Sequence, residues 1–276
     1  QLFLEDRPLL ETRGALVVRK LCSLLDSSSI YMALAKILND KSDLEFVSLM
    51  VQTLNLILLT APELSPLRRS LKMSFQPEAT EADRRTFNAI FHCWTHNAVA
   101  TFSLCLLAQA YALSSTLILK FAEVDVTVGF LMQIDKLVQL LESPIFIQLR
   151  LHLLETESHS HADLLKSLYG LLMLLPQSQA YKTLSDRLTT VSSLHMHIGL
   201  TATRAIGSTS TPAAAAASKA NPALTNGQQA GGVDVLLLKQ FDATQEKHAE
   251  FRLSVLRQKS LLSSSFALTG VSGTAP

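Results

Sequence analysis

Apolar residues recur every three or four positions from Leu9 to about Val191, and this spacing constrains the fold more than any other feature of the chain. It is the period of an α-helix that buries one side. In the first expected helix the repeat is formed by Val17, Leu21 and Leu24. Nowhere does the sequence show the strict alternation of apolar and polar residues that is typical of a strand. The pattern predicts an all-α fold.

Capping and breaking residues indicate where the helices begin and end. Ser42 and Glu45 stand in capping-box register, and Pro62 prevents the helix that they open from continuing. Thr80 with Asp83 gives a second start of the same kind. The expected helices that these and similar signals bound cover about 10–25, 30–38, 42–59, 80–94, 98–112, 115–122, 125–141, 145–154, 162–175 and 178–188.

The middle of the chain carries further boundary signals. Asn97 is placed to cap the helix that follows it, and Asp125 is placed to cap a later one. The pair Ser114-Ser115 is interpreted as a break between two shorter helices. In Ser143-Pro144 an N-cap residue precedes a proline in the first helical turn. Short helices joined by short loops are therefore expected throughout.

Helices that arrive in antiparallel pairs of about forty residues are typical of a HEAT-like α-α solenoid. No repeat is visible at the level of residue identity. We expect about eleven helices in a solenoid over residues 1–191, which would serve oligomerisation and partner binding. The Ala-rich and Gly-rich composition of 192–232 predicts a disordered low-complexity linker, followed by a C-terminal helix over 233–260 and a disordered tail over 261–276.

The expected C-terminal helix has one continuous stripe. Its members include Leu237, Phe241, Thr244, His248 and Phe251. A single helix of this length needs a surface to pack against. It could dock on its own solenoid or on another subunit, and the sequence leaves both arrangements open.

Composition excludes several classes of function. The formal net charge is +1 and only 17% of residues are charged, so no global field attracts nucleic acid. Cys22, Cys93 and Cys105 are odd in number and lie in apolar helices, which predicts reduced thiols in a cytoplasmic protein. The uncharged runs 46–62 and 98–119 are interpreted as buried helices rather than membrane spans, because polar side chains interrupt both. Since no initiating Met precedes Gln1, we expect a fragment of a longer protein.

Few residues could carry chemistry. His92 and His96 share a helix face with Cys93 nearby, but two imidazoles without a third ligand predict no metal site. A nucleophile at Cys93 with His96 as its base is the only catalytic alternative that the sequence offers. Phosphate-binding and hydrolase motifs are absent from the sequence. We predict a protein that is not an enzyme, with no catalytic residues, no metal and no cofactor.

Two small basic patches lie on either side of 75–79. One contains Arg68, Arg69 and Lys72, and the other contains Arg84 and Arg85. A solvated surface is the ordinary explanation, and a contact with acidic lipid or an acidic partner is the alternative. With the uncharged runs, these patches motivate a second hypothesis, that of a peripheral membrane-binding helical adaptor without enzyme partners.

Several long stretches resemble the C-terminal domain of the ArPIKfyve family, the associated regulators of PIKfyve, known in fungi as vacuole-morphology scaffolds. They are LLETRGALVVRKLC (9–22), DLEFVSLMVQTLNLILLTAPEL (43–64), FHCWTHNAVATFSLCLLAQAY (91–111), IDKLVQLLESPIFIQLRLHLLE (134–155), SLYGLLMLLPQSQA (167–180) and LLKQFDATQEKHAEFR (237–252). Their length and order make the resemblance specific. The chain departs from the family pattern at 76–84, in the linker and in the Ser-rich tail.

The resemblance implies a HEAT-repeat scaffold that self-associates and has no activity of its own. Such a scaffold holds a PIKfyve-type phosphatidylinositol 3-phosphate 5-kinase together with a Sac-domain phosphoinositide 5-phosphatase. It thereby regulates synthesis and turnover of phosphatidylinositol 3,5-bisphosphate. The implied location is cytoplasmic, peripheral on endosomal, lysosomal or vacuolar membranes, reached through the complex.

A scaffold of stacked helices binds through large side chains that stay exposed after folding. Any such residue could instead belong to the core, and the sequence does not separate the two possibilities. The candidate partner-binding residues are Trp94, His96, Asn97, Tyr169, Gln177, Phe241 and Phe251.

Overall fold

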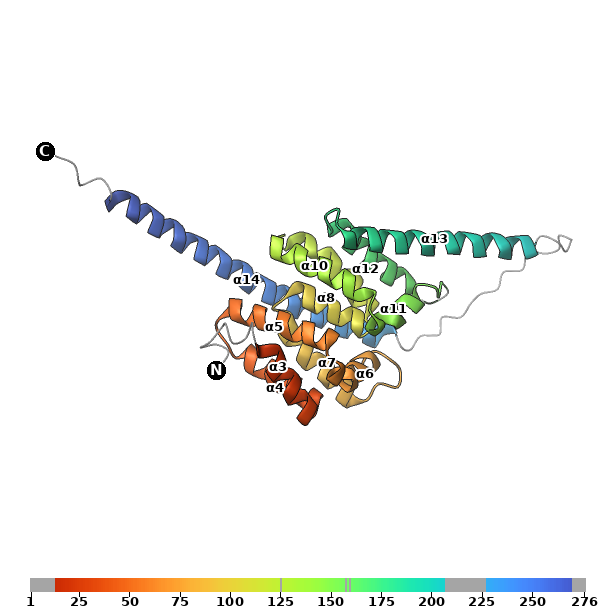
Figure 1. Cartoon of the computed structure of the whole chain (residues 1–276), viewed down its shortest axis with the longest axis horizontal. Coiled ribbons are helices and arrows are strands. Elements are labelled where there is room, and N and C mark those ends of the chain that lie inside the picture. The colour runs from red at the N-terminus through yellow and green to blue at the C-terminus, as the bar shows by residue number, and fades with distance from the viewer. Residues whose placement is uncertain (1–12, 125, 157, 159, 207–226, 270–276) are drawn as a thin grey trace.

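The computed structural model describes residues 13–124, 126–156, 158, 160–206 and 227–269 (Figure 1). Within these residues the chain forms twelve α-helices and three short 3₁₀ helices, with no strand. The prediction of an all-α solenoid is confirmed.

The helices lie in two layers. Successive members of the first layer pack side by side in the order α3 (Ala15–Leu24), α5 (Leu44–Thr60), α8 (Ala98–Leu107), α10 (Val128–Leu141) and α13 (Gln179–Ile206). In the second layer α4 (Ser27–Asn39) packs on α7 (Glu81–Trp94), and α9 (Tyr111–Lys120) packs on α12 (His161–Leu174). One continuous apolar core fills the space between the layers.

The order of helices and their neighbours repeat once along the chain. Apart from η3 (Phe121–Glu123), the elements α8 to α12 follow the pattern of α3 to α7. α5 packs on α8 as α10 packs on α13, and α7 packs on α8 as α12 packs on α13. The 3₁₀ helices η2 (Pro62–Leu64) and η4 (Pro144–Phe146) both open with proline, 82 positions apart. The molecule is therefore built from two copies of one five-helix unit, and α13 occupies the first position of a third.

Each unit contains an arginine that closes a helix end. Arg68 on α6 (Ser65–Met73) donates through Nη1 to the carbonyls of Leu58 and Ala61, both at 2.8 Å. Arg150 on α11 (Ile147–His152) donates in the same way to the carbonyls of Leu141 and Ser143. Both arginines satisfy carbonyl groups that the end of the preceding helix leaves without an intrahelical partner.

Several predicted boundaries are confirmed and one cap is wrong. Thr80 and Asp83 form a complete capping box at the start of α7, and the Asn97 side chain accepts from the backbone N–H of Ala100. α5, however, is capped by Asp43, whose carboxylate accepts from the N–H of Phe46 at 3.0 Å. The predicted Ser42–Glu45 box is one residue out of register, because the carboxylate of Asp43 competes for the same N–H groups.

The helix predicted over 98–112 also ends early. α8 stops at Leu107, and the chain turns at Gln109, which has a positive φ of 63°. The break predicted at Ser114-Ser115 does not exist, since both residues lie inside α9, where their hydroxyls bond to backbone carbonyls. A glutamine in the left-handed region carries no Gly or Asn signal from which a break could be predicted.

Other boundaries differ in the second unit and beyond it. Thr127 caps α10 through the N–H of Phe130, while the predicted cap Asp125 lies outside the described residues. Pro144 opens a 3₁₀ helix rather than an α-helix, and the side chain of Ser143 makes no cap bond. α13 extends to Ile206, and α14 (Gly227–Thr269) begins inside the predicted linker 192–232 and ends within the predicted tail. The centre of that linker, 207–226, lies outside the described residues.

Neither uncharged run behaves as a single span. In the described residues no one helix is both long and apolar enough to cross a membrane. The pair Leu44–Thr60 and Pro62–Met73 would pass by length and composition together, but it is bent by 85°. Run 98–119 is divided between α8 and α9, and every residue of α8 is buried.

Candidate functional site

The C-terminal helix α14 is docked on the solenoid of its own chain. It lies against α7 and against α9, two neighbours in the second layer that make little contact with each other. In the view of the whole chain it passes behind α8 and continues beyond the stacked helices (Figure 1). The inner side of α14 buries positions at helical spacing, namely Leu237, Phe241, Thr244 and His248. α14 therefore completes the second layer where α7 and α9 leave room for a helix.

The two halves of this contact differ in chemistry. Leu237 and Phe241 bury apolar side chains in the core. Burial and, to a lesser extent, the Asp234 carboxylate raise the pKa of the Cys105 thiol, which indicates that the start of the docked segment lies over α8. The apolar half provides most of the free energy of docking, because burying a phenylalanine or leucine contributes about 1.5–3 kcal/mol each.

The other half is polar and meets the turn between α7 and α8. The hydroxyls of Thr95 and Thr244 lie 3.1 Å apart, and Gln245 Nε2 donates to the carbonyl of Thr95 at 2.7 Å. His96 Nδ1 and His248 Nε2 lie 3.0 Å apart. Buried polar groups are tolerated when each has a partner, and such bonds fix the register of the helix more narrowly than apolar contacts do.

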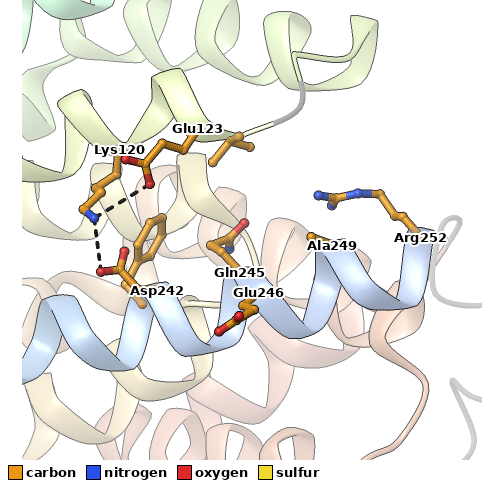
Figure 2. Close-up of a pocket in the computed structure, with 9 residues that line it drawn as sticks. Lys120, Glu123, Asp242, Gln245, Glu246, Ala249 and Arg252 are labelled. Atoms are coloured by element: carbon orange, nitrogen blue, oxygen red, sulfur yellow. Dashed lines mark ion pairs between the residues drawn. The ribbon is translucent and has the colours of Figure 1, made fainter. Parts of the chain in front are cut away.

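Ion pairs and a cleft mark the side of α14 that faces α9. Lys120 Nζ lies 3.2 Å from Asp242 and 3.7 Å from Glu123. Figure 2 shows these pairs at one end of a cleft of about 360 Å³, with Arg252 toward the other end. The Asp242 bond, ahead of its charge, raises the pKa of Lys120. The lining has both signs of charge and offers no concentrated site for an anion or a cation.

The catalytic alternative has no support in the geometry. Burial raises the pKa of the fully buried Cys93 thiol to about 12, so it is protonated at neutral pH and is a poor nucleophile. Burial, and then the neighbouring His248, lower the pKa of His96 to about 4. Among the described residues no three His, Cys, Asp or Glu side chains are grouped to hold a metal ion.

The basic patches are smaller than the sequence suggests. Arg68 is used as a helix cap, and Lys72 Nζ donates to the carbonyl of Ile145 at 3.1 Å. Burial lowers the pKa of both side chains. Arg69, Arg84 and Arg85 remain exposed. These three are the part of the two patches that could meet an external partner.

The candidate partner-binding residues fall into three groups. Trp94, Asn97 and Phe241 are buried within the chain, so they are core residues and not exposed contacts. His96 and Phe251 are half-buried, and His96 is occupied by α14. Tyr169 and Gln177 are exposed on the hairpin between α12 and α13. Aromatic size alone could not separate these groups, because a buried and an exposed aromatic residue follow the same helical spacing.

One exposed residue of that hairpin was missed in the sequence. Met173 has 87% of its surface exposed, one helical turn from Tyr169 at 41%. The Tyr169 hydroxyl lies 3.4 Å from the hydroxyl of Ser192 on α13. A spacing of four between two large side chains on the polar side of α12 was the available signal. Tyr169, Met173 and Gln177 are named the hairpin surface below.

Both five-helix units fall inside one known protein domain. A family model for the C-terminal domain of "Vacuolar protein 14" matches residues 7–191, the segment that contains both units and the start of α13. The description of this family also names the binding of a protein partner.

The chain belongs to this family.

Membership of the Vac14 family confirms the resemblance to the C-terminal domain of ArPIKfyve. The chain is 50% identical over 198 residues to "Protein VAC14 homolog" of Arabidopsis thaliana, covering 71% of this chain and 26% of the relative. It is 46% identical to "Protein VAC14 homolog" of Schizosaccharomyces pombe, covering 68% of this chain and 22% of the relative. Identity to "Vacuole morphology and inheritance protein 14" of Saccharomyces cerevisiae is 38%, covering 69% of this chain and 21% of the relative.

The chain spans about a quarter of the length of the curated Vac14 relatives that it matches. No solved structure matches it significantly. The hairpin surface lies inside the segment that the Vac14 family model matches, whereas α14 lies beyond it.

Proposed function

We propose that this chain is a non-catalytic scaffold that binds a Sac-domain phosphoinositide 5-phosphatase through its solenoid. The observation that carries the proposal is the match of residues 7–191 to a Vac14 domain described by the binding of a partner, which we take to be this phosphatase. Those residues fold into a stack whose two units present a long outer surface, as helical repeat proteins do when they bind partners.

The hairpin surface is the contact that we assign to the phosphatase. Met173 and Tyr169 together offer an exposed apolar area beside Gln177, and all three lie within the matched segment. Large exposed apolar side chains beside polar groups are typical of the centre of a protein interface. The rest of the outward side of α13 is polar, so this surface is local.

Co-purification with the phosphatase tests the assignment. We expect Met173→Glu and Tyr169→Ala to weaken binding at least about tenfold, since central interface residues contribute more than about 1.4 kcal/mol each. Met132→Glu is the matched control, because Met132 on α10 is 67% exposed and lies outside the hairpin. Unchanged binding by both hairpin variants would contradict the assignment of the surface. A chain that captures no phosphatase at all would contradict the function.

The scaffold is further proposed to hold a PIKfyve-type phosphatidylinositol 3-phosphate 5-kinase with the phosphatase and to self-associate. In this way it would regulate phosphatidylinositol 3,5-bisphosphate synthesis and turnover on endosomal, lysosomal or vacuolar membranes, where it is peripheral and held by the complex. The name of the Saccharomyces cerevisiae relative, which concerns vacuole morphology, supports the membrane system. Replacement of Cys93 by Ala tests the non-catalytic part, and cellular lipid levels should stay unchanged.

A peripheral membrane adaptor is the second candidate function, motivated by exposed Arg69, Arg84 and Arg85. Each basic residue near an anionic surface contributes about 1 kcal/mol. Flotation of the purified chain with phosphatidylserine vesicles separates the two functions. A scaffold recruited by its partners stays in the soluble fraction. Flotation that is lost in the triple Arg→Ala variant would favour the adaptor instead.

A further inference from the structure

The polar half of the α14 contact ends in two histidines that face each other across 152 residues of sequence. His96 Nδ1 lies 3.0 Å from His248 Nε2, and the rings meet edge to face with centroids 5.2 Å apart. His248 is 8% exposed. At this distance the two nitrogens share one hydrogen, which one ring donates and the other accepts. The contact is satisfied only while at least one of the two facing nitrogens carries no proton.

We propose that the contact between His96 and His248 makes the docking of α14 sensitive to acid, so that acidification releases α14 while the rest of the solenoid stays folded. When both rings are protonated, two N–H groups and two positive charges face each other at hydrogen-bond distance. Undocking separates them and returns both to water.

The surroundings of the pair oppose protonation from every side. Burial is the largest cause that lowers the pKa of each ring to about 4. The charges that act in addition are those of His92 on α7 and of Lys247 and Arg252 on α14, and each lowers a pKa further. The groups of the α7–α8 turn and α14 that bond nearby are the uncharged Thr95, Thr244 and Gln245. The α14 carboxylate that faces α9, Asp242, is bound to Lys120.

The direction of the effect follows from proton linkage. In the docked state the histidines bind protons only near pH 4, whereas in the released state they do so near their ordinary value of 6.5. Docking is therefore fully favourable above pH 6.5 and is weakened as the pH falls from 6.5 toward 4. Between pH 7 and pH 5 we expect the docking equilibrium to fall at least about tenfold.

Release is local because the remaining helices do not depend on the pair. α4 and α7 pack on each other in the first unit, and α9 packs on α12 in the second. What holds α14 at low pH is its apolar half, formed by Leu237 and Phe241, and the ion pair of Asp242 with Lys120. Loss of α14 would uncover the apolar side of α8 between α7 and α9 and open a groove of the width of one helix.

Hydrogen exchange of the full chain tests the proposal. Protection factors, corrected for the intrinsic effect of pH, are compared between 234–251 of α14 and Ser27–Asn39 of α4 over pH 7.5 to 4.5. We expect α14 to lose protection at least about tenfold by pH 5 while α4 keeps its own. Simultaneous loss of protection in both segments would overturn the proposal.

Variants locate the effect at the pair. His248→Gln keeps hydrogen-bonding groups but cannot titrate, so the loss of α14 protection between pH 7 and pH 5 should shrink to less than about threefold. His92→Gln is the control, because His92 is exposed and does not bond to α14, and it should retain most of the wild-type response. If His248→Gln prevents docking already at pH 7, His96→Gln provides the same test from the other ring. A full wild-type response in either variant that docks would overturn the proposal.

Discussion

α8 and α13 hold the same place in successive units but meet different surroundings. They begin 81 positions apart, and each packs on the preceding first-layer helix and on the preceding second-layer helix. All ten residues of α8 are buried. α13 buries only one stripe, formed by Ala180, Leu184, Leu188 and Val191. The difference is that α14 and the second unit cover α8, whereas in the described residues nothing is stacked beyond α13.

The comparison teaches that the position of a helix in the stack decides its composition. Outward positions of α13 carry Lys182, Asp186 and Arg187, which gives the polar face expected of a terminal repeat. The uncharged run 98–119 raises the question of a membrane span, yet its first helix is apolar on all sides because protein surrounds it. The same physical rule, burial without charge, applies in both environments.

The largest test places one charge in each helix. Leu106→Lys on α8 should lower the free energy of unfolding by more than about 4 kcal/mol, because the ammonium has no partner in the core. Thr190→Lys on the exposed side of α13 should change it by less than about 0.5 kcal/mol. Urea denaturation of both variants measures the difference. Similar losses in the two helices would break the comparison.

A second test concerns the helix that covers α8. Phe241→Ala removes the fully buried ring of α14 and should cost about 3–5 kcal/mol. Leu256→Ala, at a position 62% exposed on the same helix, should cost less than about 0.5 kcal/mol. The matched measurement is denaturation followed by circular dichroism. If Phe241→Ala behaved like its control, α14 would not be part of the core in solution.

A third test asks whether the two units are equivalent. Arg68→Ala and Arg150→Ala each leave two helix-end carbonyls without a partner, and each should cost about 2 kcal/mol. Arg69→Ala is the control, since Arg69 is exposed and next to Arg68 in sequence. Unequal costs in thermal unfolding would show that one unit depends less on its cap than the other does.

The smallest expected effects come from the two N-caps. Asn97 caps α8 and donates to Gln133 on α10, while Ser178 caps α13 and donates to Asp135 on α10. Asn97→Ala should cost about 2 kcal/mol, because its side chain is buried, and Ser178→Ala about 1 kcal/mol. Equal costs would remove the distinction between a covered and an open helix start. Thermal shift assays of the two variants give the ranking.

Sequence patterns predict the parts of this fold that depend on local chemistry. The capping box of Thr80 and the cap at Asn97 follow from residues three positions apart, and the helical period identifies almost every helix. The turn at Gln109 could not be predicted, because tertiary packing imposes a backbone conformation that the residue type does not favour. The duplication was hidden for a related reason: two units share their neighbours and two Pro and Arg positions, but little identity.

The candidate site was predicted less well than the fold. Its stripe on α14 was visible in the sequence, yet whether Phe241 meets a partner or the core depends on the space between α7 and α9, which only the three-dimensional packing defines. Trp94 poses the same difficulty, since it is fully buried and donates to Asn55. Tyr169 and Gln177 remain proposed contacts because they are exposed in the stack.

The mass of the purified 30.2 kDa chain in solution, alone and mixed with the Sac-domain phosphatase, tests the central claim most directly. A self-associating scaffold should show a multiple of that mass alone and a larger, stable species with the phosphatase. A chain that is strictly monomeric and whose mass is unchanged by the phosphatase would contradict the account.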